Sequence, residues 1–209
     1  SDRLLSHLEP FTGEMTAEAL RGRGVDVRLG TKVTSVERPE PGGPVTVRFD
    51  GGEVVADELL VATGRTPGTH DLGLASIGLE DGAWLDTDDS GRVRAVEGGW
   101  LYAAGDVTHR ALLTHMGKYQ ARIAGDAIVA RSRGEHAAPT AWSPYAATAE
   151  GPAVPAVVFT DPEVATVGLT EAQARDAGIP VRVVEYDLSA VSGAGLHAEG
   201  YTGRAKLVV

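Results

Sequence analysis

The chain has 209 residues, 43% of them hydrophobic and 23% charged, which is enough apolar material for a sizeable core and argues against global disorder. Nineteen basic and 29 acidic residues give a formal net charge of −10, so we expect no nucleic acid and no anionic membrane as a partner. The chain has no cysteine, which excludes disulfides, thiolate catalysis and Cys-based metal sites within these residues. No apolar run approaches the length of a membrane span, and the start of the chain lacks the pattern of a signal peptide.

The first part of the chain predicts one helix followed by strands. Residues 14–24 predict a helix with Met15, Ala19 and Leu20 on one side and Gly24 as the stop. Residues 25–29 alternate as a strand, and residues 31–37 predict another. Residues 45–49 and 53–56 flank Asp50-Gly51-Gly52, which is typical of a β-hairpin.

Two short apolar runs then predict strands buried on both faces. Residues 59–62 end at Gly64, and residues 100–104 end at Gly105-Asp106. Residues 112–130 predict the clearest helix, with apolar residues at helical spacing. These are Met116, Tyr119, Ile123, Ala127 and Ala130.

A Pro/Ala/Ser-rich stretch over residues 132–155 is the best candidate for a domain boundary. Beyond it, residues 157–159, 164–167, 181–186 and 205–209 predict strands. Thr170-Glu171-Ala172-Gln173 is a capping box that opens a short helix, closed by Gly178. The predicted class is therefore an α/β region followed by an α+β region.

Both buried strands end in glycine at the point where open α/β sheets bind ligands. Gly64 and Gly105 allow the backbone close to a ligand because they have no Cβ, and Asp106 can accept hydrogen bonds from hydroxyl groups. The helix that begins near Leu112 offers free N–H groups to a negative ligand atom. This pattern predicts a cradle for a polar cofactor. In the alternative interpretation, Asp106 merely starts a turn that caps the helix region.

These residues resemble a known family. Residues 60–67 (LVATGRTP) followed by residues 101–107 (LYAAGDV) are similar to the paired motif of the flavin-dependent pyridine nucleotide-disulfide oxidoreductases. Residues 112–115 (LLTH) resemble the next helix start of that family, and residues 159–171 resemble the start of its dimerisation domain. The four motifs occur in the family's order over essentially the whole chain, and the nearest branches are the dihydrolipoamide dehydrogenase and mercuric reductase types.

The resemblance implies an FAD-dependent enzyme that passes hydride from NAD(P)H to FAD and on to a disulfide or another acceptor. It places Gly105 and Asp106 at the FAD ribityl and diphosphate region, Gly64 near the nicotinamide dinucleotide and, more loosely, Val33 at its adenosine part. The residues that would lie beneath the pyrimidine edge of the flavin are Leu112, Leu113, Thr114 and His115. It also implies a homodimer formed through the C-terminal region, and we expect a cytoplasmic location.

The resemblance divides the chain into parts of three domains. Residues 1–57 would close an NAD(P)-binding Rossmann-like domain, residues 58–150 would close the FAD-binding domain with a linker, and residues 151–209 would start the α+β dimerisation domain. The family's two glycine-rich fingerprints, its Cys-x4-Cys pair and its His-x4-Glu pair are not found in these residues. We therefore expect an internal portion of a longer protein that contacts cofactors and holds no catalytic residue. The alternatives are a non-catalytic flavin-binding or dimerisation module and a dithiol-free reductase of quinone type.

Several other patterns have simpler interpretations than the ones that they suggest at first. Gly193–Ala198 fits a G-x-G-x-x-A fingerprint but is expected to be a flexible loop, because glycines rather than a helix follow it. Asp86–Gly91 resembles a calcium loop without its distal glutamate, so a solvated turn is expected. His109 and His115 lack a third ligand for a metal. We expect Arg131–Arg133 to form the C-terminus of a helix, and Trp142 and Tyr145 to anchor the linker by packing.

Overall fold

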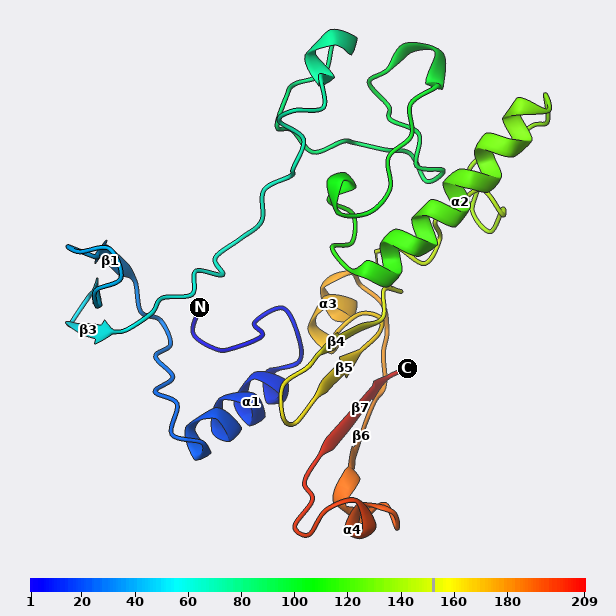
Figure 1. Cartoon of the computed structure of the whole chain (residues 1–209). Helices are drawn as coiled ribbons and strands as arrows, with labels where there is room; N and C mark the ends of the chain where they lie inside the picture. The colour runs from blue at the N-terminus through cyan, green and yellow to red at the C-terminus, as the bar shows by residue number, and fades with distance from the viewer. Residues whose placement is uncertain (152) are drawn as a thin grey trace. The chain divides into compact units, whose positions relative to one another are not determined.

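The computed structural model describes residues 1–151 and 153–209, and Pro152, inside the predicted boundary stretch, lies outside the described residues. The chain forms two compact units. The first unit consists of Ser1–Thr63, Val157–Ala165 and Leu169–Val209, and the second of Gly64–Ala156 and Thr166–Gly168. Helices and strands are mixed along the chain (Figure 1), as the sequence predicts.

The first helix, α1, covers Pro10–Gly22 and so begins four residues before the predicted start. Proline at the first helical position is favourable because it has no N–H to leave unpaired. The predicted apolar side is only half-buried, and smaller residues form the buried face instead. These are Thr12, Gly13, Thr16 and Ala17. A side chain at Gly13 would collide with the carbonyl of Leu4, so small residues on this face allow the preceding chain to pack closely.

Three strands form an antiparallel sheet in the first unit, in the order β1 (Val33–Glu37), β2 (Val45–Phe49) and β3 (Gly52–Ala56). Val47 pairs with Val36 on one side and with Val54 on the other. The predicted hairpin is confirmed, and Gly51 takes a φ of 99° in its turn, a conformation that favours glycine.

Ion pairs join distant parts of the chain within the first unit. Lys206 on β7 (Arg204–Val208) donates to Glu9, just before α1, and to Glu171 at the start of α3 (Glu171–Asp176), at 2.7 and 2.8 Å. Glu9 also accepts the backbone N–H of Glu171 at 2.7 Å. One lysine therefore links the first helix to the last strand, a contact between residues almost two hundred positions apart.

The C-terminal part contains two small sheets. β4 (Ala156–Val158) pairs with β5 (Val164–Thr166), and β6 (Val183–Asp187) pairs antiparallel with β7. The predicted capping box is present, because the Thr170 hydroxyl accepts from the Gln173 N–H and the Gln173 side chain accepts from the Thr170 N–H. The prediction of a loop near residue 195 was wrong, because Ala194–His197 forms one helical turn, α4. Its N–H groups bond back to the Gly193 and Ala194 carbonyls despite the glycines.

The second unit is built around a small apolar cluster of Leu74, Leu85, Val93 and Val96. The same unit contains the long helix α2 (Thr114–Ser132), which confirms the clearest helix predicted from the sequence. Of the five apolar residues predicted at helical spacing, four are buried and Tyr119 is half-buried, and the Tyr119 hydroxyl accepts the Ala149 N–H at 3.1 Å. The short 3₁₀ helices of this unit are η1 (Leu74–Ile77), η2 (Glu97–Gly99) and η3 (Asp106–Thr108), and a fourth, η4 (Leu188–Ala190), lies in the first unit.

Three predicted strands are absent from the described residues. Residues 25–29 and 59–62 have no strand assignment, and Leu60 is 90% exposed. Residues 100–104 form only a single bridge, between Tyr102 and Arg92. An apolar run becomes a buried strand only where neighbouring strands supply its hydrogen bonds on both sides, and no described strand flanks these runs.

Candidate functional site

The predicted Gly-Asp cradle forms a sharp turn in the second unit. Gly105 takes φ 83° and ψ −157°, a combination that a residue with a side chain rarely adopts, and it precedes η3. Asp106, the first residue of η3, is exposed to solvent. The Gly105 carbonyl accepts from the backbone N–H of Thr108 at 3.1 Å and from its hydroxyl at 2.9 Å. The turn is therefore closed on itself while the Asp106 carboxylate remains accessible.

The start of α2 is uncapped. Leu113 is extended at the N-cap, makes no side-chain cap, and the first turn contains no acidic residue. Leu112 and Leu113 are half-buried, whereas Thr114 and His115 are exposed. The His115 ring Nε2 donates to the Pro155 carbonyl at 2.8 Å. Without a capping carboxylate or hydroxyl, the first N–H groups of α2 can stabilise a negative ligand atom.

Two residues of α2 hold the turn against the helix. A Cβ at Gly117 would lie 3.2 Å from the Cα of Gly105, so the absence of a side chain there allows this approach. Gln120, buried in α2, accepts the Gly105 N–H through Oε1 at 2.6 Å. The structure therefore brings Gly105, and with it Asp106, to the first two turns of the helix that the sequence assigned to the same site.

Gly64 and Val33, the two residues assigned to the nicotinamide dinucleotide, are not part of the Gly105–Asp106 turn. Gly64 is exposed in the second unit and has open space where a Cβ would project. Val33 begins β1 in the first unit and is 55% exposed. Both are accessible, and their roles stay predictions.

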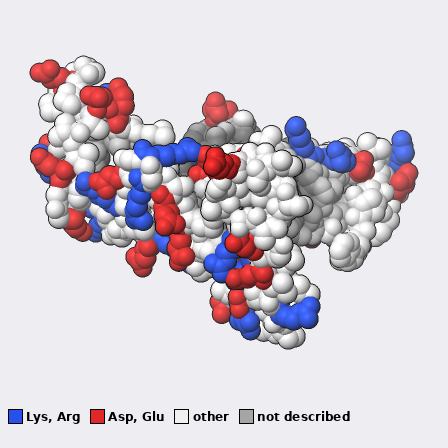
Figure 2. Space-filling view, turned by 90° about the horizontal axis from the view of Figure 1, so that it is seen from below, with Lys and Arg blue, Asp and Glu red and all other residues white. Residues whose placement is uncertain are grey.

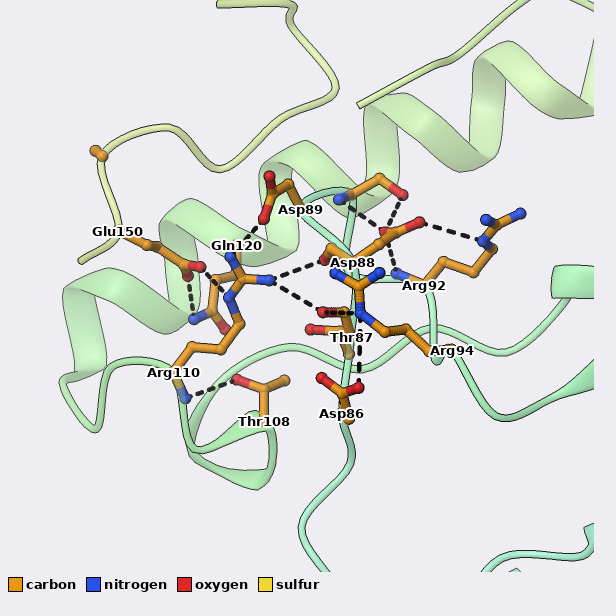
Figure 3. A network of polar contacts seen from close by, with 12 residues as sticks. Asp86, Thr87, Asp88, Asp89, Arg92, Arg94, Thr108, Arg110, Gln120 and Glu150 are labelled. Carbon is orange, nitrogen blue, oxygen red and sulfur yellow. Dashed lines mark hydrogen bonds and ion pairs between the residues drawn. The ribbon is translucent and has the colours of Figure 1, made fainter. Parts of the chain in front are cut away.

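A buried polar network beside the turn was missed in the sequence (Figure 3). Glu150 accepts from Gln120 Nε2 at 2.5 Å and pairs with Nε of Arg110. Arg110 also reaches the Asp89 carboxylate at 2.7 Å and the carbonyls of Thr87 and Asp88 at 3.2 and 3.1 Å. Burial acts to lower the pKa of Arg110, but the hydrogen bond to Asp89 and the charges of Glu150 and Asp89 raise it above its usual value. These residues line a cavity of about 10 Å³, which is close to the smallest that can hold one water molecule.

The sequence holds little signal for this network. Its members come from three segments centred on residues 88, 110–120 and 150, and no local pattern joins them. A glutamine among the apolar positions of a helix is the one feature that could have marked it, because a buried amide needs partners.

The turn at Asp86–Gly91 is not solvated as predicted. Asp88 and Ser90 are buried, and the Asp88 Oδ1 accepts from the Ser90 N–H, the Ser90 hydroxyl and the Arg92 N–H at 2.9, 2.6 and 3.1 Å. Burial acts to raise the pKa of Asp88, but these hydrogen bonds and the Arg92 charge together hold it below its usual value. The spacing Asp-x-Ser is typical of an aspartate that closes its own turn, and tertiary packing then covers it.

Replacing Asp88 by alanine is expected to lower the free energy of unfolding by about 2 kcal/mol, because it leaves the buried N–H and hydroxyl of Ser90 and the part-buried N–H of Arg92 without this acceptor. Since the folded-state pKa of Asp88 is depressed, its contribution is complete above the unfolded pKa of about 4 and is lost as the pH falls through the lower folded value. Denaturant unfolding should therefore show a gap between parent and variant at pH 7 that narrows below about pH 4.

The control for this prediction is Asp86→Ala in the same turn. Asp86 is exposed and only approaches Arg94, at 3.6 Å, so its loss should change stability by less than about 0.5 kcal/mol. Equal effects of the two substitutions would contradict the structural role of Asp88.

Other patterns are corrected or sharpened by the structure. Trp142 is 89% exposed and Tyr145 half-buried, so the prediction of packing anchors was wrong for Trp142. Arg131 lies at the helix C-terminus as predicted, and it also contacts the Tyr102 hydroxyl and donates to the Ala137 carbonyl at 3.0 Å. His109 stacks on Trp84 with ring centroids 4.3 Å apart. Among the described residues no group of three His, Cys, Asp or Glu side chains could hold a metal ion.

The described helices include none that is both long and apolar enough to cross a membrane. Acidic and basic side chains are interspersed on the face seen in Figure 2, and neither sign gathers into one large patch there.

Comparison with known protein families covers most of the chain. Residues 1–133 match the family model described as pyridine nucleotide-disulphide oxidoreductase, and residues 154–209 match the dimerisation domain of the same family. The chain belongs to the pyridine nucleotide-disulphide oxidoreductases. The resemblance recognised from the motifs is therefore confirmed, and the dimerisation domain follows the oxidoreductase region as the motifs indicate.

Similar members of this oxidoreductase family are named for different substrates. The chain is 31% identical over 205 residues to a dihydrolipoyl dehydrogenase of Staphylococcus aureus, which covers 95% of the chain and 40% of that protein. It is 34% identical to a mercuric reductase of Lysinibacillus sphaericus, covering 100% of the chain and 36% of that protein. A solved structure of the Escherichia coli flavoprotein disulfide reductase RclA, a Cu(II) complex, superposes with a TM-score of 0.79 at 26% identity, covering 100% of the chain and 44% of that structure. The chain thus spans about 40% of the length of the relatives that it matches.

Proposed function

We propose that this chain supplies the flavin-contacting turn and the dimerisation region of an FAD-dependent oxidoreductase, in which hydride passes from NAD(P)H to FAD and on to a disulfide or another acceptor. The proposal rests on membership of the family and on the geometry of the second unit. The dimerisation region would pair two copies of the chain. We name the final electron acceptor only by its chemical class, since the similar proteins are named for different substrates.

The observation that carries the proposal is the Gly105–Asp106 turn held against an uncapped helix start. Gly117 leaves a space that a Cβ would fill, and through it the Gly105 backbone reaches α2. The exposed Asp106 carboxylate can accept hydrogen bonds from ribityl hydroxyls, and the first N–H groups of α2 can face an electron-rich ring edge. These donors and acceptors fit FAD.

The chain's own residues would bind and orient the cofactor. Asp106 would fix the sugar-alcohol chain, and the positive end of the α2 dipole would stabilise negative charge near the residues of its first turn, Thr114 and His115. When bound, FAD supplies the ring that accepts and donates hydride. Gly64 and Val33 are proposed as backbone contacts to NAD(P)H, because both are exposed.

Purification of the full-length protein tests the proposal. We expect one FAD per chain in the visible absorbance spectrum, bleaching of that spectrum by NADH or NADPH without oxygen, and twice the mass of one chain by light scattering. A protein that carries no flavin and takes up none when FAD is added would refute the function. A flavin that resists reduction by both nicotinamides would favour the non-catalytic alternative.

A further inference from the structure

Gln120 is a buried amide whose two ends are both engaged. It is 5% exposed on α2, it accepts the Gly105 N–H through Oε1 at 2.6 Å, and it donates to Glu150 Oε1 through Nε2 at 2.5 Å. The direction of the amide is set by these two contacts, because the opposite orientation would place a donor against the Gly105 N–H and an acceptor against the Glu150 carboxylate.

Glu150 is fixed from its other side. Its carboxylate is 5% exposed, and Oε2 makes no hydrogen bond of regular geometry among the described residues, but Nε of Arg110 lies against it as an ion pair. Arg110 is held in turn by Asp89 and by two backbone carbonyls of the buried Asp88 turn. A continuous path of polar contacts therefore runs from that turn through Arg110, Glu150 and Gln120 (Figure 3), and it ends on the Gly105 N–H.

Gly105 needs such an anchor. Glycine adopts many backbone conformations at similar energy, so a turn through glycine does not by itself fix the direction of the residue that follows it. The Thr108 bonds hold the Gly105 carbonyl, and the bond from the Gly105 N–H to Gln120 holds the other side of the residue at a φ of 83°, directly before Asp106.

We propose that Gln120 and Glu150 act as a positioning pair for the cofactor turn: by holding the Gly105 N–H they set the Asp106 carboxylate for the hydroxyl groups of FAD. The inference rests on the proposed function. Neither residue touches the cofactor, and both act through Gly105. Pre-organisation of this kind strengthens binding, because none of the free energy of FAD binding is used to order the turn.

The pair allows a test by exchange of its two side chains. In Gln120→Glu, two buried carboxylates face each other. In Glu150→Gln, a single amide cannot present an acceptor to both Gln120 and Arg110. The double variant Q120E/E150Q restores the order of donors and acceptors, because the carboxylate introduced at position 120 would accept both from Gly105 and from the amide introduced at position 150. The oxygen of that amide would accept from Arg110.

Two measurements on the full-length protein follow the pair. The first is the dissociation constant of FAD, from titration of the apoprotein. The second is hydrogen exchange of the Gly105 amide in the apoprotein, which does not depend on FAD. We expect each single variant to weaken FAD binding by about tenfold or more and to speed exchange at Gly105, and the double variant to recover most of both losses.

The matched control is Thr69→Val in the same unit. Thr69 is fully buried, and its hydroxyl donates to the Ala83 carbonyl at 2.8 Å, so its loss removes a hydrogen bond that involves neither Gly105 nor the positioning pair. This variant should lower the melting temperature and leave FAD affinity and exchange at Gly105 unchanged.

The outcomes separate the positioning role from the proposed function. Single variants that bind FAD as the parent does, or a double variant no better than the singles, would overturn the positioning pair. If the parent binds no FAD, the proposed function fails, and exchange at Gly105 still decides whether Gln120 and Glu150 hold the turn.

Discussion

Replacing Asp106 by alanine is expected to weaken FAD binding by about 10- to 100-fold, so that the purified protein loses most of its flavin. The carboxylate is the exposed acceptor of the Gly105 turn, and a hydrogen bond to a charged group contributes roughly 1.5–3 kcal/mol. The melting temperature of the apoprotein should stay within about 2 °C of the parent value, because Asp106 is exposed and its backbone contacts do not need the side chain.

The flavin-to-protein absorbance ratio and an FAD titration of the apoprotein measure this effect. Asp71→Ala is the matched control, since Asp71 is an exposed acidic residue of the same unit outside the turn. It carries the same change of charge and should keep the flavin of the parent. If the Asp106→Ala variant retained its full flavin content, Asp106 would not contribute to FAD binding.

The second large effect is expected at Gly117. Replacing glycine by alanine should change the stability of the protein in opposite directions at Gly117 and at Gly125, two positions of the same helix. Alanine is a better helix former than glycine by about 1 kcal/mol, so Gly125→Ala, which has open space for a Cβ, should stabilise the protein. At Gly117 the new Cβ would press on the Gly105 Cα at 3.2 Å, and overpacking against backbone costs roughly 1–3 kcal/mol.

Gly117→Ala should therefore be less stable than Gly125→Ala by about 2 kcal/mol and should also weaken FAD binding, because the turn must move to admit the methyl group. Chemical denaturation and FAD titration of the two variants side by side provide the comparison. Equal stability of the two variants would show that the approach of the turn to α2 is not tight in solution.

Much of the local structure is predictable from residues close together in the chain. The hairpin around Gly51, the capping box at Thr170 and the length of α2 each depend on neighbours within a few positions, and each is found where predicted. The glycine at position 105 is explained in the same way, because a positive φ is a property of one residue.

Elements that need distant partners were predicted less well. Residues 59–62 have the composition of a buried strand, yet Leu60 is 90% exposed, because β-structure requires hydrogen bonds from another segment. Asp88 lies in a segment with the sequence of a surface turn, but it is buried. Its backbone carbonyl accepts a hydrogen bond from Arg110, which lies more than twenty positions away.

The family of this protein, the order of its regions and the residues proposed to meet the cofactor follow from the amino-acid sequence alone, since motifs are local patterns that survive changes elsewhere. Only the tertiary structure shows how the Gly105–Asp106 turn is held. Gly117 has no side chain and so lets the turn lie close to α2, and the Gln120 amide, fixed by Glu150, bonds the Gly105 N–H. A buried polar group must find its partners in space, and these partners come from segments that no spacing along the chain connects. The −10 net charge describes the chain as a whole, whereas beside the site the buried Glu150 carboxylate is paired with the half-buried Arg110 guanidinium.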